Sequence, residues 1–332
     1  MAKCIVINKK YAECVMNVLK KKRLLNTEYK VLRIDEQVLI PVQENLEDEV
    51  RDAVKLCTTD DLKFTECNPP RRKTSNSVSI PSFDIVDNVV IIRENVLRTW
   101  SIGELVENIR KVHPRVRAIW VKRETVDVYR IPVLELLWGE DIRDLMVKEY
   151  GFKFKVKLGK VFFNPRLAEE HRRLAKLVKP GEIVLDMFSG IGGFSIHIAG
   201  EVPSLVIAND LNPDAYELLL ENIVLNKRRI KGVIVPLNMN SRELPGVVRE
   251  GSVDRIIADI PGYSLNFVDE YRVLLKPGGK LHLYILAESV QVAMQSSLGK
   301  LKNWFLESCL EVLEYSPKLS VYRCDLVKPK YE

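Results

Sequence analysis

The chain of 332 residues lacks several features that would assign its class at once. No stretch approaches the roughly 20 consecutive apolar residues of a membrane-spanning helix. The first residues, MAKCIVINKKY, contain no apolar run long enough for a secretory signal peptide. We therefore expect a cytoplasmic protein with no membrane association.

The cysteines do not form a recognisable metal or disulfide framework. The sequence contains no CxxC pair, and the spacing of its six cysteines fits no zinc pattern. We expect small thiols in a reducing cytosol. No other residues form a metal-ligand motif, so we predict no bound metal. The six are Cys4, Cys14, Cys57, Cys67, Cys309 and Cys324.

Hydrophobic residues make up 46% of the chain and charged residues 29%, which is enough to build a sizeable core. The formal net charge is +6, but the positive charge is concentrated. Residues 142–179 hold eleven Lys or Arg against four Asp or Glu, a net +7. Clustered positive charge is typical of phosphate binding, so we expect a nucleic acid partner.

The order of predicted elements divides the chain into three domains and a linker. Residues 1–67 predict a small α+β module, and 68–79, rich in Pro, Ser and basic residues, predict a linker. Residues 80–163 predict a second α+β domain, ending in a strand whose lysines alternate with apolar residues. Residues 164–332 alternate strands and helices, which predicts a parallel sheet in an α/β, Rossmann-like fold.

A glycine-rich turn is the strongest motif. In VLDMFSGIGGFS an apolar strand ends at Asp186 and passes through Phe188, Gly190 and Gly192 into a helix. The GxGxxG motif of nicotinamide sites does not follow the strand directly. The loop suits S-adenosyl-L-methionine (AdoMet), which has no pyrophosphate to cradle, although a purely structural turn would also use these glycines.

Two further acidic residues end predicted strands. Asp210 lies 24 residues after Asp186 and suits the ribose hydroxyls of an adenosine, although it also suits a helix cap. Asp259-Ile260-Pro261 resembles the Asp/Asn-x-Pro signature of amino-methyltransferases. There the polar side chain and carbonyls orient a nitrogen toward the sulfonium methyl.

With these motifs in place, the chain resembles the archaeal and eukaryotic type of tRNA (guanine-37) N1-methyltransferase over nearly its whole length. The matching segments include RIPVLELLWGED, KVFFNPRLAEEHRRLAKLV, VLDMFSGIGGFS, DLNPDAYELLLENIVLNK and YSPK. The resemblance implies a class I methyltransferase domain preceded by two smaller domains that bind tRNA. It implies AdoMet as cofactor, tRNA as partner and a monomer.

The resemblance also implies residue roles. Arg130 would steady charge on O6 of the target guanine, and Glu170 would accept the N1 proton as general base. Asp259 and Pro261 would lie beside the cofactor and the base. The cofactor residues it implies are Phe163, His171, Asp186, Phe188, Gly190, Gly192, Asp210, Leu211, Asn240 and Asp259.

Independently of the resemblance, the helical spacing of four residues supports the general-base role of Glu170. The four are Leu167, Glu170, Leu174 and Leu177. The spacing puts Glu170 on the apolar stripe of a helix that begins at Asn164-Pro165. A desolvated carboxylate has a raised pKa and accepts a proton near neutral pH. The other interpretation is a carboxylate that is favoured near a helix N-terminus.

Three positions depart from the family pattern: His171 stands for Arg, Asn240 for Asp, and DIPGYSLNF for NLPGSAHEF or similar. The first two bear on cofactor affinity, and the third on which base or atom is modified. The alternatives are a wyosine-pathway relative, an inert tRNA-binding protein and a small-molecule methyltransferase. The wyosine-pathway relative would methylate or aminocarboxypropylate a modified guanosine at the same tRNA position.

Overall fold

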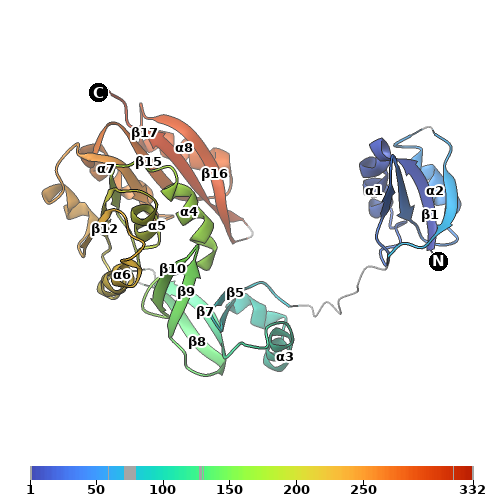
Figure 1. Cartoon of the computed structure of the whole chain (residues 1–332), viewed down its shortest axis with the longest axis horizontal. Helices are drawn as coiled ribbons and strands as arrows, with labels where there is room; N and C mark the ends of the chain where they lie inside the picture. Colours follow the sequence, from blue (N-terminus) through green and yellow to red (C-terminus); the bar gives the residue numbers. More distant parts are fainter. Residues whose placement is uncertain are drawn as a thin grey trace. The chain divides into compact units, whose positions relative to one another are not determined.

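A computed structural model describes residues 2–58, 60–70, 80–126, 129, 131–316 and 318–330, without the side chains of residues 124–126. The chain forms two compact units, Met1–Ser79 and Ile80–Glu332 (Figure 1). The predicted linker of residues 68–79 lies mostly outside the described residues. None of the helices among the described residues has the length and apolar character needed to cross a membrane.

The first unit is a four-stranded antiparallel sheet in the order β2-β3-β1-β4. Its core joins the sheet to one face of each helix, with Val15 and Leu19 on α1 and Val50 on α2. This unit has the α+β character expected from the sequence. The elements are β1 (Ala2–Asn8), α1 (Ala12–Lys21), β2 (Leu32–Ile34), β3 (Gln37–Pro41), α2 (Glu47–Val54) and β4 (Lys63–Cys67).

The second unit begins with a four-stranded sheet in the order β5-β6-β7-β8. A turn at Asp87-Asn88 joins the first two strands, and Asp87 adopts φ +54° there. The helix of this part buries Leu105, Val106 and Ile109, and the sheet covers them. The elements are β5 (Phe83–Val86), β6 (Val89–Arg93), α3 (Ile102–Val112), β7 (Ala118–Val126) and β8 (Ile131–Gly139).

A hairpin of β9 (Asp144–Glu149) and β10 (Phe152–Lys157) connects this sheet to the rest of the unit. The expected alternation along β10 is confirmed, because its apolar residues are buried and its lysines exposed. Asn222 and Asn226 of α6 (Pro213–Asn226) exchange side-chain hydrogen bonds with the backbone of Lys155 and Lys153. One hydrophobic core contains residues on both sides of positions 163 and 164. The domain boundary that the sequence predicts between these positions stays a prediction.

The remainder of the second unit is built on a seven-stranded sheet in the order β13-β12-β11-β14-β15-β17-β16. Its first five strands pair in parallel, and β17 is antiparallel to β15 and β16. The strands are β11 (Ile183–Asp186), β12 (Leu205–Asn209), β13 (Val233–Leu237), β14 (Val253–Ala258), β15 (Leu275–Ala287), β16 (Phe305–Ser316) and β17 (Leu319–Val327).

Helices cover both faces of this sheet, which makes three layers (Figure 1). One core cluster joins α4 (Ala168–Ala175) and α5 (Gly193–Glu201) to one face. Another joins α7 (Val268–Leu274) and α8 (Val290–Lys300) to the other face. The alternation along β11, with Val184 on the first face and Leu185 on the second, explains why the strand is apolar throughout. The predicted α/β, Rossmann-like architecture is confirmed.

The cysteines correct the sequence prediction. The structure pairs all six as Cys4–Cys67, Cys14–Cys57 and Cys309–Cys324, with Cα–Cα distances of 6.0, 5.8 and 4.0 Å. Two of these pairs connect hydrogen-bonded strands, β1 with β4 and β16 with β17. The expectation of free thiols is wrong because partners 63, 43 and 15 residues apart have no spacing that marks them as pairs.

Deleting residues 1–67 should leave a folded protein, because the core clusters of the second unit include no residue before Phe83. We expect a single cooperative thermal transition, measured by circular dichroism, and a monomeric species in gel filtration. Aggregation of the truncated chain would contradict the independence of the two units.

Candidate active site

Three carboxylates lie at the carboxyl ends of neighbouring strands. Asp186 ends β11, Asp210 follows β12, and Asp259 follows β14. Because β11 pairs in parallel with both β12 and β14, these strand ends meet at one edge of the sheet. The strand order reverses here, and ligands of open α/β sheets bind at such a point.

Asp186 is fully buried and only partly hydrogen-bonded. Its Oδ2 accepts a hydrogen bond of 2.7 Å from the Ser195 hydroxyl, while Oδ1 has no partner among the described residues. Burial, with the charges of Asp259 and Asp210, raises the pKa of Asp186 to about 7, although the Ser195 hydrogen bond acts against this. The carboxyl group therefore has an acceptor available for a ligand donor.

The glycine-rich loop is tied to Asp210. The Gly190 N–H donates to Asp210 Oδ2 at 2.8 Å, and the Asn212 N–H donates to Oδ1 at 2.9 Å. Gly190 has φ +53° and only open space where a Cβ would be. Gly192 has φ +97°, a backbone conformation that favours glycine, and a Cβ there would also lie 2.6 Å from Leu219 Cδ1.

Other residues expected at the cofactor site surround the same sheet edge. Phe188 packs edge-on against Phe267, with ring centroids 4.9 Å apart. The Asn238 amide donates to the carbonyls of Asp210 and Leu211, and the Leu211 side chain is exposed. The Asn240 side chain caps the short helix that follows it, by accepting a hydrogen bond from the Arg242 N–H.

These features fit AdoMet. The buried Asp186 Oδ1 requires a donor, and ammonium and ribose hydroxyl groups are donors. The space beside Gly190 lets a ligand approach the backbone, and exposed Leu211 offers an apolar surface. Asp186, Gly190, Asp210 and Leu211 would therefore hold the cofactor.

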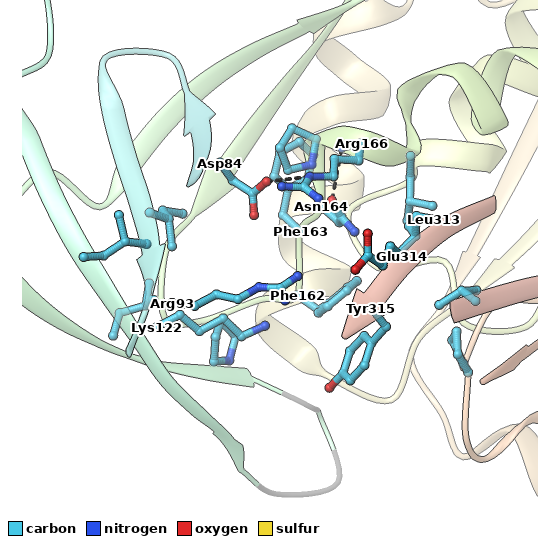
Figure 2. A pocket seen from close by; sticks show the side chains of 18 of the residues that line it. Asp84, Arg93, Lys122, Phe162, Phe163, Asn164, Arg166, Leu313, Glu314 and Tyr315 are labelled. Atoms are coloured by element: carbon cyan, nitrogen blue, oxygen red, sulfur yellow. Dashed lines mark hydrogen bonds and ion pairs between the residues drawn. The ribbon is translucent and has the colours of Figure 1, made fainter. Parts of the chain in front are cut away.

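A pocket of about 570 Å³ opens beside Asp259 and Pro261. This volume is typical of small-molecule sites. Figure 2 shows Arg93 and Lys122 reaching into the pocket from the β5–β8 sheet, toward Phe162. Tyr315 of β16 forms part of the opposite wall.

The pocket and the glycine-rich loop meet at Asp259. Asp259 lines the pocket together with Pro261 and Phe163, and its charge acts on the carboxyl group of Asp186. A group bound in the pocket would therefore adjoin a cofactor held at the loop. Arg130, expected to face the target base, lies outside the described residues.

Family comparison agrees with this geometry. The family model of the TRM5/TYW2 methyltransferase domain matches residues 145–313, and the tRNA methyltransferase 5 N-terminal domain matches residues 4–50. The chain belongs to the TRM5/TYW2 methyltransferase family.

Its relatives include two proteins named tRNA (guanine(37)-N(1))-methyltransferase Trm5b. The one from Pyrococcus abyssi is 37% identical over 204 residues, which cover 61% of this chain and 59% of the relative. The one from Methanocaldococcus jannaschii is 29% identical and covers 98% of both chains. Among solved structures, the complex of aTrm5 with tRNALeu has a TM-score of 0.64 at 26% identity, covering 98% of this chain and 99% of that one.

In this TRM5/TYW2 member, Glu170 occupies a different environment from the one expected. It is 7% exposed, as its place on the apolar stripe predicts, but it does not line the pocket. Its carboxylate accepts hydrogen bonds from Tyr284 Oη at 2.7 Å, Arg323 Nη1 at 2.8 Å and Arg173 Nε at 2.9 Å. The predicted raised pKa is wrong. Burial alone would raise it, but these three donors lower the pKa of Glu170 below its ordinary value.

Arg323 continues this contact into a buried polar chain on the α4 side of the sheet. Arg323 Nε lies 2.9 Å from Asp325, and Asp325 lies 2.6 Å from His282 Nδ1. The other His282 nitrogen lies 2.6 Å from Arg255, which pairs with Glu182. The position of Glu170 therefore depends on residues of three strands.

Sequence reasoning missed several residues that shape the site. Arg93 and Lys122 line the pocket without belonging to a motif that marked them. Phe162 and Tyr315 also line it, and the KVFFNPR and YSPK segments of the family resemblance could have indicated them. Arg323 and Tyr284 hold Glu170 from β17 and β15, and only strand pairing brings them together.

The raised pKa of Asp186 predicts a pH-dependent stability. The folded protein keeps a proton on Asp186 that the unfolded chain releases above about pH 4. The free energy of unfolding should therefore fall as pH rises from about 4 toward 7, by up to ~1.4 kcal/mol per pH unit from this one proton. Urea unfolding of Asp186→Asn, without AdoMet, should lack this part of the slope.

Asp269→Asn is the matched control, because its carboxylate is 88% exposed at the start of α7. It should keep the wild-type slope. Equal slopes in wild type and Asp186→Asn would show that Asp186 does not keep its proton in the folded protein.

Proposed function

We propose that this chain transfers the methyl group of AdoMet to N1 of guanosine 37 in the anticodon loop of tRNA. The observation that carries the proposal is the position of Asp259, which lines the pocket and follows β14, the strand that pairs with β11 beside Asp186. Family membership and relatives named for this reaction support the same substrate.

The target base must leave the anticodon loop to reach this pocket. Asp259 and the backbone beside Pro261 would accept hydrogen bonds from the guanine and orient N1. Phe163, at the same wall, would adjoin both the base and the cofactor.

Bound AdoMet supplies a methyl group attached to a positively charged sulfur. Because this sulfur is a good leaving group, the transfer itself requires no metal. Glu170 is the proposed acceptor of the N1 proton, and Arg130 would offset negative charge that develops on guanine O6. The three donors around Glu170 keep it ionised at neutral pH, which is the form a base requires. The same three hydrogen bonds hold the Glu170 carboxylate in place. It would therefore accept the N1 proton through a bridging water, or after one of these hydrogen bonds breaks.

The rest of the chain would deliver the tRNA. Lys153, Lys155 and Lys157 are exposed on one face of β10 and would follow the phosphate backbone. Residues 1–67 would bind the tRNA outside the anticodon loop, since residues 4–50 match a tRNA methyltransferase N-terminal domain. We further propose that the enzyme acts in the cytoplasm as a monomer.

The function is tested by nucleoside mass spectrometry of a tRNA transcript incubated with the protein and AdoMet. We expect 1-methylguanosine at position 37 and none with a transcript carrying adenosine there. Asp210→Ala is the matched variant, and it should weaken AdoMet affinity by roughly 1–3 kcal/mol, the cost of lost hydroxyl partners. Product only from tRNA that already carries a tricyclic guanosine would instead establish a wyosine-pathway enzyme.

Single-turnover rates across pH test the proposed base. Glu170→Gln should slow methyl transfer by roughly 10²–10⁴-fold, while AdoMet and tRNA affinities change little. Because the pKa of Glu170 is lowered, the wild-type rate should show no step from this group between about pH 6 and 8. Thermal unfolding of the variant shows whether the loss of charge beside Arg323 disturbs the fold.

Asp259→Asn is the comparison variant, because Asn keeps the hydrogen-bond acceptor and removes the negative charge. It should transfer methyl at close to the wild-type rate if Asp259 only orients the guanine. A wild-type rate in Glu170→Gln, together with a large loss in Asp259→Asn, would assign proton removal to Asp259.

A further inference from the structure

Three buried side chains from separate elements meet behind the glycine-rich loop. They are Glu149 at the end of β9, His171 in α4 and His197 in α5, and they are 4%, 7% and 2% exposed. The function proposed above uses neither Glu149 nor His197. None of the three lines the active-site pocket.

Their donor atoms have the spacing of a metal site. Glu149 Oε2 lies 2.9 Å from His171 Nδ1 and 3.3 Å from His197 Nε2, and all three atoms lie within 4.8 Å of one another. The ligand atoms of a tetrahedral ion with bonds near 2.0–2.1 Å are roughly 3.3 Å apart. An ion between the three atoms therefore requires only small side-chain shifts.

Hydrogen bonding within the cluster leaves two buried atoms without partners. Glu149 Oε1 has no hydrogen-bond partner among the described residues, and the 3.3 Å contact of His197 Nε2 with Glu149 Oε2 does not have hydrogen-bond geometry. An unsatisfied buried polar atom is costly, and each such case requires an explanation. A bound ion would satisfy both atoms if Glu149 brings both of its oxygens to the ion, and with one nitrogen from each histidine the four donor atoms would form a distorted tetrahedron.

From this convergence we propose that Glu149, His171 and His197 bind one divalent transition-metal ion of the zinc class. Two imidazoles and one carboxylate favour Zn²⁺ and its neighbours over Mg²⁺ or Ca²⁺, which prefer oxygen ligands alone. The proposal does not depend on the reaction that the enzyme catalyses.

The surroundings indicate a structural ion. Phe152 and Phe154 contact His197 with ring centroids 4.7 and 6.0 Å away, and Phe194 lies 4.6 Å from His171. This aromatic shell separates the cluster from water, so the ion would have no position open to substrate. It would fasten the β9–β10 hairpin to α4 and α5.

The site would also support the cofactor loop. A Cβ at Gly193, the first residue of α5, would lie 2.5 Å from His171 Cε1, so the imidazole rests directly on the backbone there. Fixing His171 through an ion would hold α4, which also carries Glu170, against the start of α5.

The test uses the full-length protein, stripped with a chelator and kept free of reductant so that the disulfides stay intact. Zn²⁺ is added, and bound metal is measured by mass spectrometry of the elements after gel filtration, with affinity from calorimetry. We expect one Zn²⁺ per chain and a higher midpoint of thermal unfolding in the loaded protein. Co²⁺ in place of Zn²⁺ should give the visible absorption of a tetrahedral ion.

Glu149→Gln and His197→Phe should each weaken Zn²⁺ affinity by more than about 100-fold, beyond the usual effect of changes outside the ligand shell. Phe at 197 suits the aromatic surroundings and so keeps the core filled. His113→Asn is the matched control, because this histidine lies at the end of α3 and is not part of the cluster. The His113→Asn protein should bind Zn²⁺ like wild type.

Two results would overturn the proposal. Stripped wild-type protein that binds no Zn²⁺ when the ion is supplied in excess would mean that the three residues form only a hydrogen-bonded cluster. Equal Zn²⁺ affinity in wild type and both variants would mean that the ion binds elsewhere. The wild-type titration decides the first point even if a variant does not fold.

Discussion

Parallel pairing of β11 with β12 on one side and β14 on the other brings Asp186, Asp210 and Asp259 to one edge of the sheet. Like charges in a buried setting repel each other, so this arrangement is costly without a partner. The protein offsets part of the cost locally, because two backbone N–H groups donate to Asp210 and the Ser195 hydroxyl donates to Asp186. What remains unsatisfied is an acceptor facing the loop, and a cationic cofactor would compensate it. The carboxyl groups that make this edge costly are therefore also the feature that favours AdoMet.

On the α4 side of the sheet, in contrast, buried groups of opposite charge pair with one another. The chain runs from Glu170 on α4 through Arg323, Asp325, His282 and Arg255 on three strands to Glu182. Its members alternate in sign or donor character. Removing one member of such a chain leaves its neighbour uncompensated, which is usually strongly destabilising. The same contacts give Glu170 a defined rotamer and a lowered pKa. Its chemistry is thus a property of β15 and β17 as much as of its own helix.

The second unit also shows how one hairpin connects substrate and cofactor regions. The buried face of β10 packs into a core shared with β5–β7 and with the helices of the seven-stranded sheet. Its exposed face carries three lysines. The adjoining strand ends in Glu149, beneath the glycine-rich loop. The hairpin therefore joins the β5–β8 sheet to the seven-stranded sheet through packed side chains.

Local pattern determined much of this protein. Alternation along β10, the Asn164 and Asn212 caps and the strand–glycine–helix turn after Asp186 all depend on neighbouring residues, so the sequence predicts them directly. The contacts between distant residues were decided by the tertiary structure. Sequence spacing cannot reveal the Cys309–Cys324 pair or the Glu149–His171–His197 cluster, because their members meet only after the sheet and its helices assemble. Burial was likewise predicted for Glu170, but the sign of its pKa shift was not. Desolvation raises a carboxyl pKa. Arg173 is a local donor, three residues along the same helix, but only the tertiary structure adds the Arg323 and Tyr284 donors that help to reverse the shift.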